Sequence, residues 1–446
     1  MAELLGTASF PTGDLLLVDF GLLGYWCGDR PPVLAEGLLK GEALARANAA
    51  VDFEIVGADA AAVARRLDLA DVKGRFAFDL PADGGSVVAK VREVCRESGL
   101  DASVRRVARV AHLERVRRLL DDDPGGVEVP YTGGWAVAVR GVPARELRVL
   151  GERMDDGEFE ARWRSVWVEC AEGEPVRSVE CGYVVVDESR LMFADPLALN
   201  AWRENVSEDG LYDVEFWGGD AAAVFERLVE PKPSEMDDRS AYAWVDLAGG
   251  EAAERHRELG ELQRSGLRFR AVVRPHDDDY RIRLQADHNL TESGTIEVGG
   301  AKVTGWFTSW GDGMYPLYRD LAADGTLLRV RVELGTPEIV ARQRKAERWW
   351  FGDLAKKAIV TARVARDGVP AGRLIRDEPI DERDSGWQVV AGDESREYLD
   401  DLSNAVLMPL RELIELDPDL EPLFDAAAPA EFERRGGVFV PVPESS

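Results

Sequence analysis

A sixteen-residue segment occurs twice in this chain and constrains its fold more than any other feature. Residues 52–67 read DFEIVGADAAAVARRL, and residues 213–228 read DVEFWGGDAAAVFERL, with ten of the sixteen positions identical. The spacing of the two segments is far longer than the roughly 20–50 residues of solenoid repeats. We therefore expect two globular copies of one unit side by side, residues 1–175 and residues 182–336.

The repeated segment predicts a strand, a glycine turn and a helix. Residues 53–55 and 214–217 alternate apolar with acidic residues, which is typical of a half-buried strand. Asp59 and Asp220 precede AAAV, where an aspartate can cap a helix N-terminus. Such a turn can also cradle phosphate. No glycine-rich phosphate motif is present, however, so we expect capping.

Strand-like and helix-like segments are mixed along the rest of both copies. The order predicts an α+β fold and not a regular βαβ alternation. A smaller α+β domain, residues 356–446, is expected to follow. The predicted strands cover 183–186, 267–273, 280–285, 295–298 and 327–332, and the predicted helices cover 86–97 and 249–263.

The charge balance restricts the partners of this chain. Its 446 residues carry a formal net charge of -28. Nucleic acid and anionic membrane surfaces would repel such a protein, so we expect neither as a partner. A cationic partner fits the charge, and so does the simpler interpretation that acidity keeps the protein soluble.

The cysteines and the apolar runs indicate a cytoplasmic protein. The four cysteines form no C-x-x-C pair, which is typical of a reducing compartment. The first twenty residues have no basic segment before their apolar run, and Asp14 and Asp19 interrupt that run. No run approaches the roughly 18 apolar residues that span a membrane.

Residues 305–313, GWFTSWGDG, occur in the second copy only. This stretch and the following residues are similar to the closing segment of an uncharacterised bacterial family, which implies no chemistry. We expect a β-hairpin, because Gly-Asp-Gly suits a tight turn. The alternative is a site formed by Trp310, Asp312 and Tyr315.

A linker helix is predicted over residues 337–355. Thr336, Pro337 and Glu338 form a typical helix start. Six basic residues follow, and we expect an inter-domain strut whose cations pair with acidic residues. A membrane-surface helix is the alternative. The basic residues are Arg342, Arg344, Lys345, Arg348, Lys356 and Lys357.

Catalytic motifs are absent from the sequence. It has four histidines and neither an H-E-x-x-H nor a G-x-S-x-G motif. The alternative worth stating is a metal-dependent enzyme, in which His276, Asp278 and His288 meet across a hairpin of residues 280–285. The simpler interpretation is an acidic turn, so we expect no catalytic residue and no cofactor.

The C-terminal region carries the most specific pattern. Residues 384–387 read DSGW, residues 392–394 read GDE, and residues 431–434 read EFER. This order resembles the bacterial immunity protein 33 family, a domain of unknown function. Members are thought to protect bacteria from polymorphic toxins. The resemblance implies that the chain is a binding protein and not an enzyme.

An immunity role implies a cationic toxin as the partner. Residues 397–425 contain nine acidic residues and one basic residue, and complementary charge speeds association. Two alternatives stay open for Trp387, which either fills the core or anchors the partner. The acidic residues likewise form either a binding interface or a face that only contacts solvent. A scaffold with this region as an accessory is a further alternative. The candidate partner-binding residues are Asp384, Trp387, Asp393, Glu394, Tyr398, Asp400, Asp401, Glu412, Glu415, Asp417 and Asp419.

Overall fold

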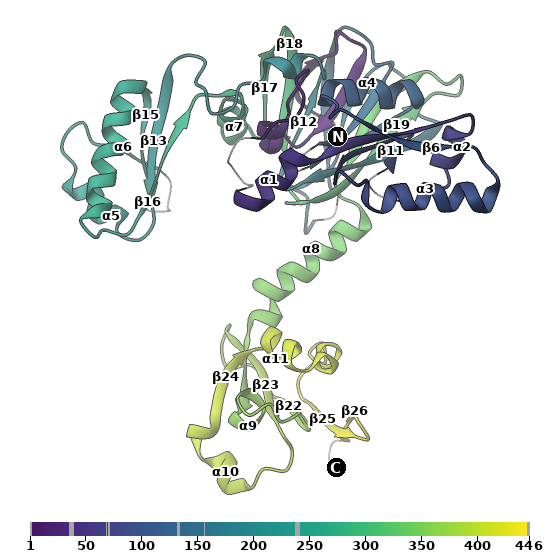
Figure 1. The fold of residues 1–446 in the computed structure, drawn as a ribbon. Coiled ribbons are helices and arrows are strands. Elements are labelled where there is room, and N and C mark those ends of the chain that lie inside the picture. Colours follow the sequence, from purple (N-terminus) through teal and green to yellow (C-terminus); the bar gives the residue numbers. More distant parts are fainter. Residues whose placement is uncertain are drawn as a thin grey trace. The chain divides into compact units, whose positions relative to one another are not determined.

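The computed structural model describes residues 2–34, 40–67, 69, 72–131, 134–155, 157–236 and 241–443. Helices and sheets are mixed along the chain, as expected for an α+β protein, and it divides into two compact units, Met1–Thr336 and Pro337–Ser446 (Figure 1). Each unit has a hydrophobic core of its own. Among the described residues, no helix has the length and apolarity needed to cross a membrane.

Two six-stranded antiparallel sheets form the centre of the first unit. One sheet has the order β1 (Glu3–Ser9), β9 (Glu146–Arg153), β10 (Trp163–Glu169), β20 (Leu327–Glu333), β19 (Gly313–Leu321) and β11 (Arg177–Val186). The other has the order β17 (Ser293–Val298), β18 (Ala301–Phe307), β12 (Arg190–Ala194), β2 (Asp14–Val18), β8 (Gly134–Arg140) and β7 (Val127–Tyr131). The hydroxyls of Ser293 and Thr304 donate to the carbonyl oxygens of Leu5 and Thr7, which ties β1 to the second sheet.

Strands from both predicted copies share each of these sheets. Three adjacent strands of each sheet come from residues 3–169, and the other three come from residues 177–333. The two sets meet where β2 pairs with β12 and where β10 pairs with β20. The sequence predicted two globular copies side by side, and it did not predict that they share sheets. Either set alone would leave the edge of a buried apolar strand unpaired, and the shared pairing removes that edge.

Two smaller sheets flank the centre. The first has the order β4 (Val72–Lys73), β5 (Phe76–Leu80), β3 (Val51–Val56) and β6 (Ser103–Val107), with α2 (Ala60–Ala64) and α3 (Gly85–Ser98). The second has the order β14 (Ser234–Met236), β15 (Ala241–Ala248), β13 (Leu211–Trp217) and β16 (Arg270–Pro275), with α5 (Ala221–Arg227) and α6 (Gly249–Arg264). The predicted helices at 86–97 and 249–263 are confirmed.

The remaining helices of the first unit are short. They are η1 (Phe20–Tyr25), α1 (Gly41–Ala49), α4 (His112–Asp122), η2 (Ala198–Ala201) and α7 (Asp278–His288). Helix α4 contacts β7, and helix α7 contacts β17. Each of these two helices therefore returns the chain from a small sheet to a six-stranded one.

The two predicted capping aspartates have a different role. The Asp59 side chain accepts no bond from its own helix, and its Oδ2 accepts the N–H of Asp101 at 2.8 Å. Likewise, Asp220 Oδ2 accepts the N–H of Arg268 at 2.7 Å. These carboxylates therefore fix the chain just before β6 and β16 to the glycine turn.

The predicted strand at 280–285 is wrong, because these residues lie within α7. Asp277 accepts the N–H of Tyr280 at 2.9 Å and caps the helix. Asp278 and Asp279 lie in the first turn, where the helix dipole favours acidic residues. The capping aspartate and the acidic first turn favour a helix here, although apolar residues alternate as they do in a strand.

The predicted hairpin at 305–313 is also wrong. Strand β18 ends at Phe307 in one sheet, and β19 begins at Gly313 in the other, so the segment crosses between sheets. Trp310 is buried and donates to the carbonyl oxygen of Trp163 at 2.6 Å. The hydroxyl of Tyr315 donates to Gly311, and Asp312 accepts from the N–H of Ser189. These contacts stabilise the crossing.

The second unit contains one mixed sheet. Its order is β24 (Ala405–Pro409), β21 (Lys357–Thr361), β23 (Asp384–Val390), β22 (Arg373–Arg376), β25 (Ala430–Arg435) and β26 (Val438–Pro441). Strands β21 and β23 are paired in parallel, and the other neighbours in this order are antiparallel. The helices are α8 (Pro337–Trp350), η3 (Asp353–Ala355), α9 (Ala362–Ala365), α10 (Arg396–Asp400), η4 (Leu402–Asn404), α11 (Leu410–Leu416) and η5 (Pro418–Leu423). In α8, Arg348 pairs with Asp425 at 2.7 Å, and Lys345 lies 3.5 Å from Glu421.

Candidate functional site

The two faces of the second unit's sheet differ in burial. Ala358, Val360 and Leu374 are fully buried and pack with residues of α11 and η5. The opposite face carries a cross-strand row of half-buried and exposed residues, which we call the open face. It consists of Leu407, Ile359, Gln388, Ile375 and Glu431, one from each of five neighbouring strands.

The open face is apolar on one side of the sheet and charged on the other. At one side, Leu407 is 66 % exposed, and its direct cross-strand partner Ile359 is 44 % exposed. At the other side, Glu431 forms an ion pair with Arg373 at 2.6 Å. The apolar half therefore lies on β24 and β21, and it has the composition expected of the centre of a protein interface.

Strand β24 forms one edge of this sheet. Among the described strands it pairs with β21 alone, so one row of its backbone groups faces away from the sheet. Leu399 in α10 and Leu402 in η4 directly precede it and are 47 % and 85 % exposed. Figure 1 shows α10 at the end of β24. An apolar, exposed edge of this kind is a common place for a second chain to pair.

Trp387 lies in the core. Its side chain is 1 % exposed, and its ring contacts Phe424 and Phe432 at centroid distances of 5.5 and 6.2 Å. The guanidinium of Arg376 lies 5.4 Å from the ring. The sequence left open whether Trp387 fills the core or anchors a partner, and the structure places its side chain in the core beneath the sheet.

Three of the acidic candidates hold loops together. Glu394 accepts the N–H of Ala391 and the hydroxyl of Thr361, at 2.7 and 2.8 Å. Burial opposes its ionisation, but these bonds outweigh burial and lower the pKa of Glu394. Asp384 accepts the N–H of Gly386 at 2.9 Å, and Asp401 caps η4. These carboxylates fix the backbone next to the sheet.

Four further candidates lie near arginines. Asp393 pairs with Arg363, whose hydrogen bond lowers the pKa of this carboxyl. Arg434 lies 2.5 Å from Asp417 and 3.7 Å from Asp419, and Arg411 lies 3.9 Å from Glu412. These pairs reduce the negative charge that the region presents.

Asp400, Glu415 and Tyr398 complete the set. Asp400 and Glu415 are exposed and take part in no ion pair among the described residues. Tyr398 is half-buried, and its carbonyl oxygen accepts the side-chain N–H of Asn404 at 3.0 Å. Asp400 ends α10 and therefore lies next to the exposed leucines that lead into β24.

The structure separates the residues of the metal alternative. His276 precedes α7 and His288 ends it, and eleven residues of helix extend about 16 Å. Asp278 accepts the N–H of Arg203 at 2.8 Å, and His288 Nδ1 lies 2.7 Å from the carbonyl oxygen of Leu284. His276 instead contacts Asp213, a residue of β13 that sequence reasoning did not connect with it.

Sequence reasoning also missed the apolar part of the open face. The alternation of Ala405, Leu407 and Pro409 with Val406 and Met408 was the available signal, since alternate residues of a strand point to opposite faces. It could not show which face is covered, because that depends on α11 and η5.

The second unit is thus a small α+β domain with one covered face and an exposed edge. Residues 358–440, which include part or all of each of the six strands, match the family model described as the Immunity protein Imm33 domain. This match shows the family resemblance of the C-terminal region. No curated protein matches the chain, and no solved structure matches it.

Proposed function

We propose that the chain is an immunity-type protein that neutralises a protein toxin in the bacterial cytoplasm by stoichiometric binding, without catalysis or a cofactor. The match of residues 358–440 to an immunity-protein domain carries this proposal. The fold of that region adds a surface that suits a binding role.

The toxin binds at β24 and the adjoining part of the open face. Leu407, Ile359 and Leu402 supply apolar area, which favours association when it is removed from water. The exposed edge of β24 can add main-chain hydrogen bonds to a strand of the toxin. Asp400 and Tyr398 lie next to this edge and supply polar contacts.

The partner is a cationic toxin. A toxin that acts on nucleic acid needs a cationic surface for phosphate. The chain has a net charge of -28, and Asp400 and Glu397 are exposed on α10. Long-range attraction between such surfaces raises the association rate and weakens with salt.

Toxin neutralisation tests the proposal. The full chain is used to isolate its partner from the native host at low salt, and the recovered toxin is then co-expressed with the chain. We expect wild-type protein to restore growth. Asp400→Lys should weaken protection, whereas Glu251→Lys, the same charge change at an exposed position of α6, should not.

Two results would contradict the proposal. In one, the chain binds no toxin and restores no growth. In the other, Asp400→Lys and Glu251→Lys reduce protection equally, which would mean that total charge matters and the surface near β24 does not.

We further propose that residues 1–175 and 182–336 are two copies of one unit, joined by shared sheets. In each half, a four-stranded sheet has its third strand directly before the repeated Ala-Ala-Ala-Val helix. Apart from α1, which has no counterpart among the described elements, the element order of the second half repeats that of the first from β1–β10 to β11–β20. This correspondence supports the duplication.

A further inference from the structure

A pair of aspartates occupies corresponding places in the two halves of the first unit. Asp52 and Asp213 lie where the strand register shifts in β3 and β13. Asp52 Oδ1 accepts the N–H of Asp79 at 2.8 Å, and Asp213 Oδ1 accepts the N–H of Asp246 at 3.0 Å. Asp79 and Asp246 both have a positive φ, 57° and 55°. The two pairs therefore have the same local geometry.

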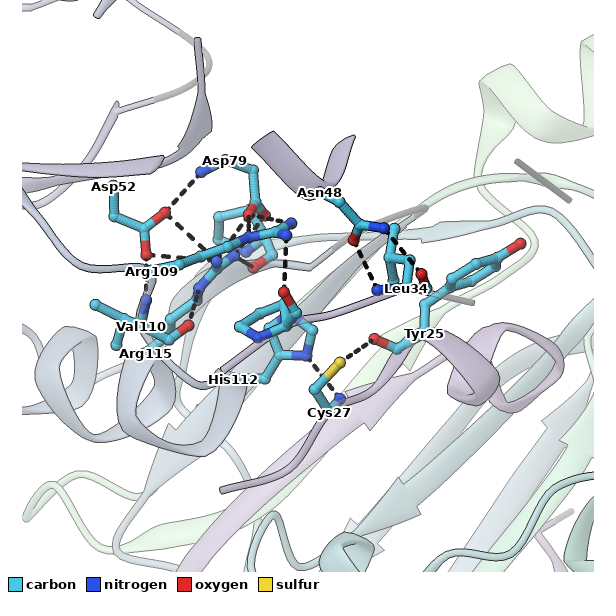
Figure 2. A network of polar contacts seen from close by, with 12 residues as sticks. Tyr25, Cys27, Leu34, Asn48, Asp52, Asp79, Arg109, Val110, His112 and Arg115 are labelled. Carbon is cyan, nitrogen blue, oxygen red and sulfur yellow. Dashed lines mark hydrogen bonds and ion pairs between the residues drawn. The ribbon is translucent and has the colours of Figure 1, made fainter. Parts of the chain in front are cut away.

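In the first half, a cation bridges the pair. Arg115 is fully buried, and its guanidinium lies 2.6 Å from Asp79 and 3.5 Å from Asp52. Arg109 adds a second guanidinium at 2.8 Å from Asp79 (Figure 2). Two carboxylates in a buried place require such compensation, because unpaired charge is costly there.

In the part of the second half that the structure describes, no guanidinium forms an ion pair with either aspartate. Among the described residues, Asp213 and Asp246 have His276 as their one basic neighbour, with Nε2 at 2.9 and 4.0 Å. Asp209 lies 3.3 Å from the other ring nitrogen. One imidazole thus faces three carboxylates, and negative charge exceeds positive charge whether or not the ring is protonated.

The ring of His276 is oriented as in a metal site. Its Nδ1 faces the carboxylate of Asp209, and its Nε2 faces Asp213 and Asp246. A histidine that binds a metal through one nitrogen usually donates its other N–H to a carboxylate. The hydroxyl of Tyr280 donates to Asp213 Oδ2, and its ring stacks on His276 at 4.8 Å. Asp213 and His276 are therefore held in place.

We propose that Asp213, Asp246 and His276 bind a zinc ion, which takes the bridging role that Arg115 has in the first half. One ligand atom from each residue lies within 4.8 Å of the others. Zinc bonds are about 2 Å long, so two ligand atoms of one ion lie at most about 4 Å apart. The side chain of Asp246 is 71 % exposed and is free to close the remaining distance.

The donor set selects zinc over magnesium. An imidazole nitrogen with two carboxylates suits zinc, whereas magnesium prefers oxygen ligands alone. Three protein ligands leave one position of a tetrahedral ion for water. The site is independent of the proposed toxin surface, which belongs to the second unit.

Calorimetry with zinc chloride tests the site. The full chain is freed of metal with a chelator and titrated with zinc, then with magnesium. We expect one zinc ion per chain at this site and no competition by magnesium. His276→Gln and Asp246→Asn should each weaken binding at least about tenfold. Asp246→Asn keeps the backbone N–H that Asp213 accepts, so it preserves the fold.

His288→Gln is the matched control, because His288 is an exposed histidine at the end of α7. Its affinity for zinc should equal that of the wild type. The proposal is overturned if the wild type binds no zinc, if His276→Gln or Asp246→Asn binds as the wild type does, or if His288→Gln weakens binding as much as His276→Gln. If cysteines held the zinc, His276→Gln and Asp246→Asn would bind zinc as the wild type does.

Discussion

Arg115 is a fully buried cation that pairs with two carboxylates of the first unit, Asp52 and Asp79. Its guanidinium donates to the carboxylate of Asp79 and to the carbonyl oxygens of Val110 and Pro130. Burial alone would raise the pKa of Asp79, but Arg115 and Arg109 together outweigh burial and lower it to about 2. At Asp52 burial prevails and the pKa is raised. The buried carboxylate of Asp52 therefore depends on Arg115 for its compensating charge.

Arg115→Met should lower the free energy of unfolding by about 3–5 kcal/mol, because it leaves the fully buried carboxylate of Asp52 without a cation and leaves Asp79 with Arg109 alone. The matched control is Arg105→Met, whose side chain is 62 % exposed and pairs with Glu54. That change should cost less than about 1 kcal/mol. Urea denaturation of the full chain, followed by hydrogen exchange in residues 51–131, measures both. Equal effects would contradict the role of Arg115.

The imidazole of His112 should stay neutral at pH values well below the usual pKa of histidine. Burial, and then the charge of Arg115, lower its pKa to about 3. Because the folded pKa lies below the unfolded value of about 6.5, the folded state binds fewer protons and loses stability as pH falls from 6.5 toward 3. NMR of the imidazole protons should show no titration between pH 8 and pH 5. A midpoint near 6.5 would contradict the buried position.

At the scale of single elements, local sequence predicts much of this structure. The helices at 86–97 and 249–263 and the strands at 53–55 and 214–217 follow from apolar periodicity. Residues 280–285 do not, because the capping bond of Asp277 decides between helix and strand there. Contacts such as His276 with Asp213 join residues far apart in sequence, and no local pattern contains them.

Trp387→Ala should destabilise the second unit by about 3–5 kcal/mol, because it removes the largest fully buried side chain of that core and leaves a cavity. Trp350→Ala is the control, since Trp350 is 59 % exposed. It should cost no more than about 1 kcal/mol, including its contact with Arg411. Hydrogen exchange of residues 357–435 in the full chain reports both values. Comparable protection in the two variants would place Trp387 outside the core.

At the scale of the whole molecule, the sequence predicts the α+β class and the place of the immunity-like domain at the C-terminal end. It does not predict that the two halves of the first unit share their sheets. The pairing of β2 with β12 and of β10 with β20 depends on edges that exist only once each half has folded. The sequence could not predict the open face either, because packing with α11 and η5 decides which side of β21 and β24 is buried. The net charge of -28 favours a cationic partner but does not locate its contact surface.

The affinity of the full chain for its toxin, measured for one pair of variants, tests the proposed function most directly. Leu407 on β24 and Val438 on β26 are both 66 % exposed and lie on opposite edge strands of one sheet. We expect Leu407→Lys to weaken binding at least about tenfold, because it places a cation at the centre of the interface with a cationic toxin. Val438→Lys should leave the affinity unchanged. Equal affinities for the two variants, or a larger loss for Val438→Lys, would contradict binding at β24.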